Sequence, residues 1–316
     1  MKQIKLIFYF LIFFSLINCS EMRQITANKI GDKKINYALP SYSNDFFIIC
    51  NDDGEIVIVN LENNIVEKKI KIVNEQIITS ELSRNGKYLA LSTASSILLY
   101  DFINLSLISK LNIENGIVIA LSFSNDSKYL FTGGSDEVIN CFKIPDFSLK
   151  YSKQLLHKRI LDFCMEDDDK YILTYYIAGP RHNWGVDIFE FPSFNEAASI
   201  RYPTELWDFC YKDERFFCSG FNDYSIDIID MKNLQIKKYW NGNLGNPVNC
   251  IFSNNKELFA SLQSDNSILI GKIDDGTPVK RIKNPTDIPL TYISFNYNDK
   301  KLIAFDYKNN LFIWNL

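Results

Sequence analysis

Short runs in which apolar and polar residues alternate follow one another along the chain from about residue 35 onward, and polar turns separate them. The clearest unit spans residues 118–143, with apolar strands at 118–124, 129–132 and 138–142. Alternation of β-branched and aromatic residues over short runs is typical of β-strands. Sustained helical periodicity is absent after residue 35. The pattern therefore predicts an all-β chain.

The same unit recurs seven times at nearly constant spacing. The turn residue that corresponds to Lys128 recurs every 41 to 45 residues, and the seven positions are Asp45, Lys87, Lys128, Lys170, Arg215, Glu257 and Lys300. A fixed period of this length is the mark of a repeat architecture, with about 40–45 residues expected for one propeller blade. Even spacing argues against the alternatives, a β-sandwich or two separate all-β domains.

The repeat unit resembles the WD repeat. That family has an apolar strand, a Phe-Ser-Pro-Asp-Gly-like turn, small residues before an Asp, and a third strand that ends in Trp-Asp. Here Ser122-Phe123-Ser124 precedes the turn, Asn125 replaces the Pro, and Phe142-Lys143 replace the Trp-Asp, to which Trp314-Asn315 come nearest. The resemblance implies a seven-bladed β-propeller of four-stranded antiparallel blades.

The last repeat stops directly after its third strand, at residues 311–316. Residues 22–30 precede the first repeat and are available to pair with it. Propellers commonly close their ring in this way, which removes an exposed sheet edge. We therefore expect the N-terminal strand to complete the last blade.

The N-terminus has the pattern of a secretion signal. Lys2 and Lys5 precede an apolar run at 6–17, which is too short to span a membrane, where about 20 residues are needed. The run ends in Leu16-Ile17-Asn18-Cys19-Ser20, which resembles the lipobox of bacterial lipoproteins, although Asn18 stands where a smaller residue is usual. This resemblance implies cleavage before Cys19 and lipidation, palmitate included, of its thiol.

The expected organisation is therefore a signal peptide at 1–18 and one propeller domain at 19–316. The lipid would anchor the protein to the bacterial cell membrane or outer membrane. The alternative is an ordinary cleaved signal with an incidental Cys19 and a secreted or periplasmic protein.

Composition excludes some functions. The formal net charge of −4 argues against nucleic acid as a main partner, and two His residues leave little material for His-based metal sites or general bases. The remaining cysteines show no metal-ligand spacing and fit buried strand positions, although Cys210 and Cys218 flank a tight turn and have the spacing of a possible cross-strand disulfide. No phosphate loop, nucleophile elbow or zinc-protease motif occurs, so we expect no cofactor. We also expect a monomer.

The hydrogen-bonded network of WD blades is incomplete here. Its turn Asp is present at Asp53, Asp136, Asp223 and Asp265, whereas the matching His is absent, with His157 one place away from it. These Asp residues are therefore interpreted as turn formers.

One turn breaks the length of the repeat. Residues 177–185 bring Arg181, His182 and Trp184 together, and Arg and Trp are common interface hot spots. The alternative is a tolerated insertion whose Trp covers a core edge.

Asp162 and Asp208 occupy matching positions in the near copies Leu161–Cys164 and Trp207–Cys210, at the expected start of the innermost strand, and Asn249 follows in the next repeat. With Arg181, His182 and Trp184, the two Asp residues form our predicted partner-binding patch on one face. The three positions Asp162, Asp208 and Asn249 would also suit a hard cation such as Ca²⁺, or hydrogen bonds to the backbone.

The leading hypothesis is a non-catalytic scaffold that binds an unknown protein partner or ligand at the envelope. The alternative is an envelope hydrolase or lactonase-like enzyme with a metal at the channel mouth.

Overall fold

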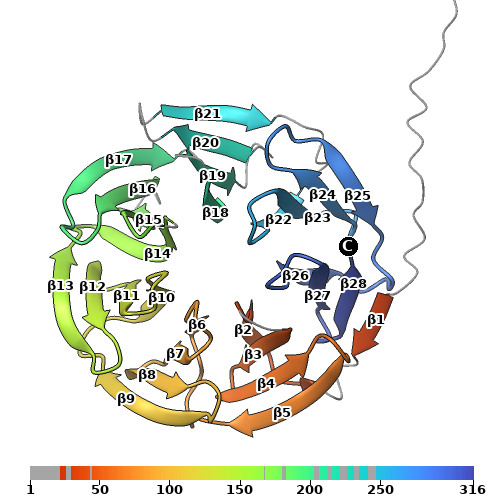
Figure 1. Ribbon diagram of the computed structural model, residues 1–316, viewed down its shortest axis with the longest axis horizontal. Coiled ribbons are helices and arrows are strands. Elements are labelled where there is room, and N and C mark those ends of the chain that lie inside the picture. The colour runs from red at the N-terminus through yellow and green to blue at the C-terminus, as the bar shows by residue number, and fades with distance from the viewer. Residues whose placement is uncertain are drawn as a thin grey trace, which may run out of the picture.

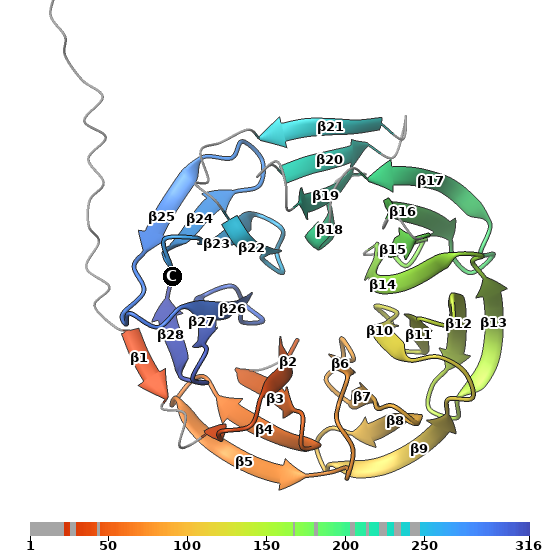
Figure 2. The ribbon, with the colours of Figure 1, turned by 180° about the vertical axis from the view of Figure 1, so that it is seen from behind.

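The computed structural model describes residues 22–25, 30–42, 45–166, 168–179, 183–202, 206–212, 215–220, 226–230, 235–240 and 247–316. Within these ranges, the strands form seven four-stranded antiparallel sheets arranged in a ring (Figures 1 and 2). Successive strands of a sheet run from the centre of the ring to its rim. The predicted β-propeller with four-stranded antiparallel blades is therefore confirmed.

The sheets follow one another around the ring in chain order. The first four sheets contain β2 (Ile35–Pro40), β3 (Phe46–Asn51), β4 (Glu55–Asn60) and β5 (Ile65–Lys71); β6 (Thr79–Leu82), β7 (Tyr88–Ser92), β8 (Ser96–Asp101) and β9 (Ser106–Asn112); β10 (Val118–Phe123), β11 (Tyr129–Gly134), β12 (Val138–Lys143) and β13 (Ser148–Gln154); and β14 (Lys158–Met165), β15 (Tyr171–Ala178), β16 (Asn183–Glu190) and β17 (Glu196–Tyr202). The others contain β18 (Leu206–Lys212), β19 (Arg215–Gly220), β20 (Ile226–Asp230) and β21 (Gln235–Trp240); β22 (Pro247–Phe252), β23 (Leu258–Gln263), β24 (Ile268–Lys272) and β25 (Pro278–Ile282); and β26 (Leu290–Phe295), β27 (Lys301–Asp306), β28 (Leu311–Asn315) and β1 (Met22–Ile25).

The ring closes through pairing of the two ends of the described chain. β1 pairs antiparallel with β28, with Met22 opposite Trp314 and Ile25 opposite Leu311 (Figure 1). The prediction of an N-terminal closing strand is confirmed, although that strand ends at Ile25, and residues 26–29 of the predicted segment lie outside the described residues. The closing strand protects the edge of β28, which would otherwise present unpaired backbone groups.

The core lies between neighbouring sheets. In one cluster, Ile48 and Ile58 of the first sheet pack with Leu89 and Leu91 of the second. Where the ring closes, the rings of Phe47 and Phe305 lie 5.9 Å apart between centroids. Middle strands such as β7 and β27 are buried almost throughout, whereas the rim strand β5 is largely exposed. Each sheet therefore buries both faces, which explains the apolar runs of the middle strands.

Polar contacts also join neighbouring sheets. The backbone N–H of Asn125 donates to Asp169 Oδ1 at 2.8 Å, and that of Asn254 donates to Asp299 Oδ1 at 2.8 Å. In each case, the turn after one innermost strand is held by an Asp in the corresponding turn of the next sheet. Asp169 belongs to the acidic run at 166–169, so this run contributes a contact between two sheets.

The register of β18 and β19 bears on the possible cross-strand disulfide. It sets Cys210 opposite Phe217 and Cys218 opposite Phe209. The two cysteines are therefore not directly opposed in the backbone ladder.

Candidate functional site

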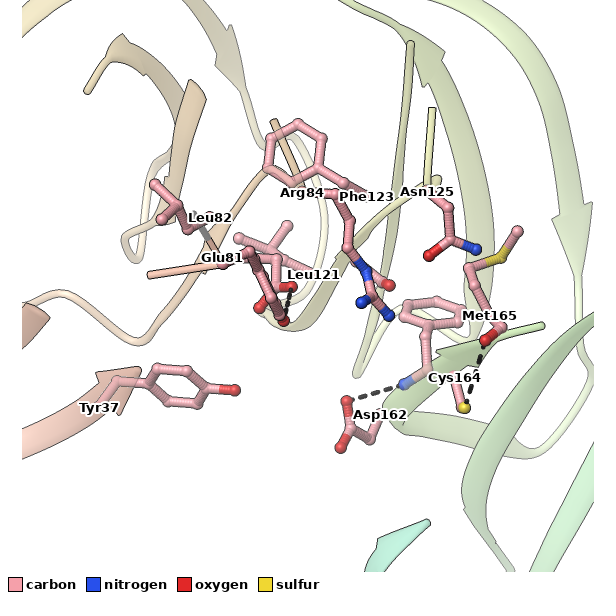
Figure 3. Close-up of a pocket in the computed structure, with 13 residues that line it drawn as sticks. Tyr37, Glu81, Leu82, Arg84, Leu121, Phe123, Asn125, Asp162, Cys164 and Met165 are labelled. Atoms are coloured by element: carbon pink, nitrogen blue, oxygen red, sulfur yellow. Dashed lines mark hydrogen bonds between the residues drawn. The ribbon is translucent and has the colours of Figure 1, made fainter. Parts of the chain in front are cut away.

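A polar pocket of about 230 Å³ lies at the end of the inner strands β2, β6, β10 and β14 (Figure 3). Its wall combines side chains of these strands with side chains of the turns that follow them. The lining residues are Tyr37, Tyr42, Glu81, Leu82, Arg84, Leu121, Ser122, Phe123, Asn125, Asp162, Phe163, Cys164 and Met165. Four consecutive sheets thus contribute to one site.

Asp162 lies within β14 at a bulge between Ile160 and Asp162, where the strand gains one residue relative to β15. The backbone N–H of Phe163 donates to Asp162 Oδ1 at 2.8 Å, which leaves Oδ2 without a hydrogen bond in the described part of the chain (Figure 3). Burial in the pocket raises the pKa of Asp162 to about 6, an effect that the Phe163 hydrogen bond partly offsets. The carboxylate is therefore largely charged near neutral pH.

Glu81 projects into the same pocket from β6 (Figure 3). The hydroxyl of Tyr42 donates to Glu81 Oε1 at 3.2 Å. Burial raises the pKa of Glu81 to about 8, and the nearby charge of Asp162 adds to the rise, while Tyr42 and Arg84 oppose it. Glu81 is therefore mostly protonated at pH 7, and the pair carries close to one negative charge.

Two tyrosines and one arginine complete the polar wall. The guanidinium carbon of Arg84 lies 5.0 Å from the ring centroid of Tyr42, which orients the side chain by a cation–π contact. Burial, followed by the charges of Asp162 and Glu81, raises the pKa of Tyr37, although 36% of this residue remains exposed in the channel. The Tyr37 hydroxyl and the Arg84 guanidinium make no hydrogen bond within the described residues. Both groups are thus available to a ligand.

Sequence reasoning selected Asp162 as a candidate, in a different grouping, and missed Tyr37, Tyr42, Glu81 and Arg84, which line the pocket with it. A signal for Glu81 exists, because it is the charged residue of the otherwise neutral inner strand β6, Thr79–Leu82, and charged side chains are rarely buried without a role. Tyr37 and Asp162 follow a bulge at the same place in their strands. The repeat alignment could therefore have identified the inner ring of side chains.

The predicted equivalence of Asp162, Asp208 and Asn249 is confirmed for the backbone. Each follows a bulge in its inner strand, after Ile160, Leu206 and Pro247, respectively. Asp162 was expected at the start of the innermost strand, but β14 begins earlier, at Lys158. The side chain of Asp208 lies outside the described residues. Among the residues whose side chains are described, no group of three His, Cys, Asp or Glu could hold a metal ion.

The structure does not bring Asp162 to the face predicted for the partner-binding patch. The turn after β15 lies at the end of the sheet where β14 begins, since Lys158 pairs with Ala178. The pocket instead includes Met165 at the end of β14, together with Arg84 and Asn125 in turns at that same end. Asp162 lies in the middle of β14, opposite Tyr175, whereas Trp184 lies opposite Ile177, near the end of the sheet where β14 begins.

Trp184 is not a turn residue. β15 extends to Ala178 and β16 begins at Asn183, so both ends of the predicted turn at 177–185 belong to strands. The Trp184 ring stacks on Tyr175, with centroids 5.7 Å apart and planes inclined by 15°, and the residue is half-buried. This agrees with the alternative in which Trp184 covers a core edge. Arg181 and His182 lie outside the described residues.

Turn geometry supports the interpretation of the repeated Asp residues. Asp265 Oδ1 accepts the N–H of Ser267 at 2.9 Å and its hydroxyl at 2.6 Å, and Asp136 Oδ1 accepts the N–H of Val138 at 3.4 Å. Asp53 instead forms an exposed ion pair with Lys33 at 3.6 Å. Asp223 lies outside the described residues.

A buried ion pair lies elsewhere in the β14–β17 sheet. Lys158 Nζ donates to the two carboxylate oxygens of Asp187 at 2.7 and 2.9 Å, and the Ser199 hydroxyl donates to the same carboxylate at 2.6 Å. Asp187 is fully buried, and Lys158 Nζ lies 4.4 Å from the Tyr176 ring centroid. This set is fully paired within the sheet, so its role is structural.

Residues 106–143, which include β9 to β12, match the family described as "WD domain, G-beta repeat". The chain therefore contains a WD repeat within a β-propeller. It is also similar in structure to a chain of the Kuenenia stuttgartiensis hydrazine synthase, with a TM-score of 0.75 and 13% sequence identity. That likeness covers 89% of this chain and 95% of the other, and it shows the fold alone. No curated protein matches the sequence.

Proposed function

We propose that the protein is a non-catalytic binding scaffold, a seven-bladed WD-repeat propeller anchored by lipid to the bacterial envelope. The observation that supports binding is the pocket of Figure 3, which the polar groups of Tyr37 and Arg84 line without a hydrogen-bond partner in the described part of the protein. Rigid sheets hold these groups in place, and sites on a rigid scaffold bind without the cost of ordering loops. The binding partner of a propeller is determined by such a site and does not follow from the fold alone.

The proposed anchor is Cys19, with the signal peptide at 1–18 and the propeller at 19–316. Both Cys19 and residues 1–21 as a whole lie outside the described residues. In the sequence, only Ser20 and Glu21 separate Cys19 from β1. A lipid at Cys19 would hold the ring close to the membrane, next to the β26–β28 sheet that β1 completes. Within the described residues, no helix is long and apolar enough to cross a membrane.

Cell fractionation of wild type and Cys19→Ala tests the anchor. We expect the wild type in the membrane fraction and the variant in the soluble fraction, because two or more acyl chains hold a protein stably in a bilayer. Ser20→Ala is the matched control and should remain membrane-bound. A soluble wild type, or a variant that stays with the membrane, would contradict lipidation at Cys19.

Affinity capture from detergent-solubilised membranes tests the scaffold function. Wild type is compared with Arg84→Gln, which alters the pocket, and with a double Arg181→Ala and His182→Ala variant, which alters the turn after β15. A specific partner should be lost with one of the two variants and retained with the other. A set of captured proteins that neither variant changes would contradict binding at both proposed places.

The second candidate is an envelope hydrolase or lactonase-like enzyme, and one observation favours it. Two neighbouring carboxyl groups, Asp162 and Glu81, have raised pKa values of about 6 and about 8, and such shifts are frequent among catalytic acids and bases. Metal ligation by Asp162, Asp208 and Asn249 stays a prediction. Metal analysis of the purified protein, with Asp162→Asn as control, distinguishes the enzyme from the scaffold if a bound metal disappears in the variant.

A further inference from the structure

We propose that the pocket binds a small zwitterion, whose primary ammonium group is held by Asp162, Glu81 and Tyr37 and whose carboxylate is held by Arg84. The inference rests on the proposed binding function and names its ligand class. It starts from polar atoms that line one cavity and have no hydrogen-bond partner in the described part of the chain. Figure 3 shows Tyr37, Glu81, Arg84 and Asp162 around the same space.

The acceptors of the pocket suit an ammonium group. Asp162 uses Oδ1 for the Phe163 N–H, which leaves Oδ2 as an unused acceptor, and Glu81 uses Oε1 for the Tyr42 hydroxyl. Glu81 Oε2 is also unused among the described contacts, and it becomes an acceptor when the carboxyl group, whose pKa is raised to about 8, loses its proton. The Tyr37 hydroxyl adds a third unused acceptor. A primary ammonium group has three N–H donors and no acceptor, which matches this set. The Tyr37 ring adds an aromatic face, which attracts cations.

The carboxylate of a zwitterion would meet Arg84 in the same pocket wall. The Arg84 guanidinium lines the pocket, and none of its N–H donors is hydrogen-bonded to a protein acceptor within the described residues. Stacking over Tyr42 at 5.0 Å limits the freedom of its side chain before any ligand arrives. A guanidinium held in this way favours a carboxylate, because two parallel N–H donors match its two oxygens.

The charge and the volume of the pocket further restrict the class of ligand. The charged residues among those that line the pocket are Asp162, Glu81 and Arg84, so acceptors for a cation and donors for an anion occur together. A zwitterion satisfies both and adds no net charge to the pocket, whereas a simple amine leaves Arg84 unpaired and a simple acid leaves Asp162 unpaired. A volume of about 230 Å³ suits a molecule of amino-acid size rather than a peptide.

Titration calorimetry on the full, detergent-solubilised protein tests the proposal. The probes are glycine, 4-aminobutanoate and 6-aminohexanoate, which vary the distance between the two charges. Butylamine and butanoate are the half-ligands of the middle compound, and calcium chloride tests a plain cation site. We expect at least one zwitterion to bind about tenfold more tightly than either half-ligand, since each end forms charge-assisted hydrogen bonds.

Matched variants decide which groups bind. Asp162→Asn and Arg84→Gln should each weaken binding of the preferred zwitterion about tenfold or more. The controls Asp168→Asn and Arg159→Gln make the same changes at exposed positions outside the pocket and should leave binding unchanged. Melting curves of all four proteins establish that each variant is folded. Binding that survives Asp162→Asn or Arg84→Gln in a folded protein overturns the assignment.

The affinity of the preferred zwitterion should rise as the pH increases from 6 to 8, because Asp162 and then Glu81 ionise over this interval. The other groups that face the pair are Tyr37, Tyr42 and Arg84; burial raises the pKa of Tyr37, and the charge of Glu81 followed by burial raises that of Tyr42. Glu81→Gln should abolish the part of the rise above pH 7.

A half-ligand or calcium that binds as tightly as every zwitterion overturns the proposal, and so does the absence of binding by all three zwitterions. If the zwitterion proposal fails in this way, partner capture that depends on residue 181 or 182 would still support the scaffold function. The failure of this inference and that of the proposed function are therefore distinguishable.

Discussion

At the scale of single residues, Glu166 occupies a place that other sheets give to a small polar side chain. In the turns after β6, β10 and β22, a serine hydroxyl accepts the backbone N–H of the residue five positions later in the chain. The serines are Ser83, Ser124 and Ser253, and the distances are 2.8, 3.0 and 2.9 Å. The backbone N–H of Glu166 makes the same turn contact with Tyr171 as theirs do, at 3.0 Å. Only 7% of Glu166 is exposed, however, and its Oε2 lacks a hydrogen-bond partner within the described residues.

Replacement of Glu166 should therefore stabilise the protein. Glu166→Asn copies the last sheet, where Asn296 Oδ1 accepts the N–H of Lys301 at 2.8 Å. The change removes an unsatisfied buried oxygen and adds a turn hydrogen bond, with an expected gain of about 1 kcal/mol, or roughly 2–4 °C in melting temperature. Ser124→Ala is the opposite control and should lower the melting temperature by a similar amount. A lower melting temperature for Glu166→Asn would show that the buried carboxyl group is itself stabilising.

At the scale of elements, the turns after the inner strands connect neighbouring sheets. Asp169 accepts the N–H of Asn125 at 2.8 Å, its side-chain amide at 2.9 Å, and the N–H of Asp126 at 3.2 Å. Asp299 repeats the arrangement on Asn254 and Asn255. Hydrogen bonds to a charged group are worth about twice those between neutral groups, so one Asp joins two sheets effectively.

Asp169→Asn should lower the free energy of unfolding by about 1–3 kcal/mol, because one acceptor oxygen becomes an N–H group that faces a backbone donor. Asn tolerates the left-handed backbone at this position, where φ is 55°, so the change isolates the hydrogen bonds from backbone strain. Asp168→Asn is the matched control, since Asp168 is exposed beside it. Urea unfolding of both variants measures the effect, and equal midpoints would show that the contact adds no stability.

At the scale of the whole molecule, closure of the ring depends on four residues. Replacement of residues 22–25 by Gly-Ser-Gly-Ser keeps the chain length but removes the strand preference that pairs β1 with β28. The β26–β28 sheet would then have an open edge beside Phe312 and Trp314, both of which are buried. We expect the melting temperature to fall by about 5 °C or more. A melting temperature equal to that of the wild type would show that the ring closes in another way.

The sequence by itself determined the repeat, the strands and the closing segment. These features are local, because alternation, turn residues and an even period each act over a few neighbouring residues. Only the tertiary structure decided the composition of the pocket. Tyr37, Glu81 and Asp162 are far apart in the chain, and they meet because the ring brings the inner strands β2, β6 and β14 around one axis. Trp184 shows the same limit. The local pattern predicts it in a turn, whereas in the structure it belongs to β16 and its ring stacks on that of Tyr175. Strand ends depend on such packing across the sheet, which a local pattern does not contain.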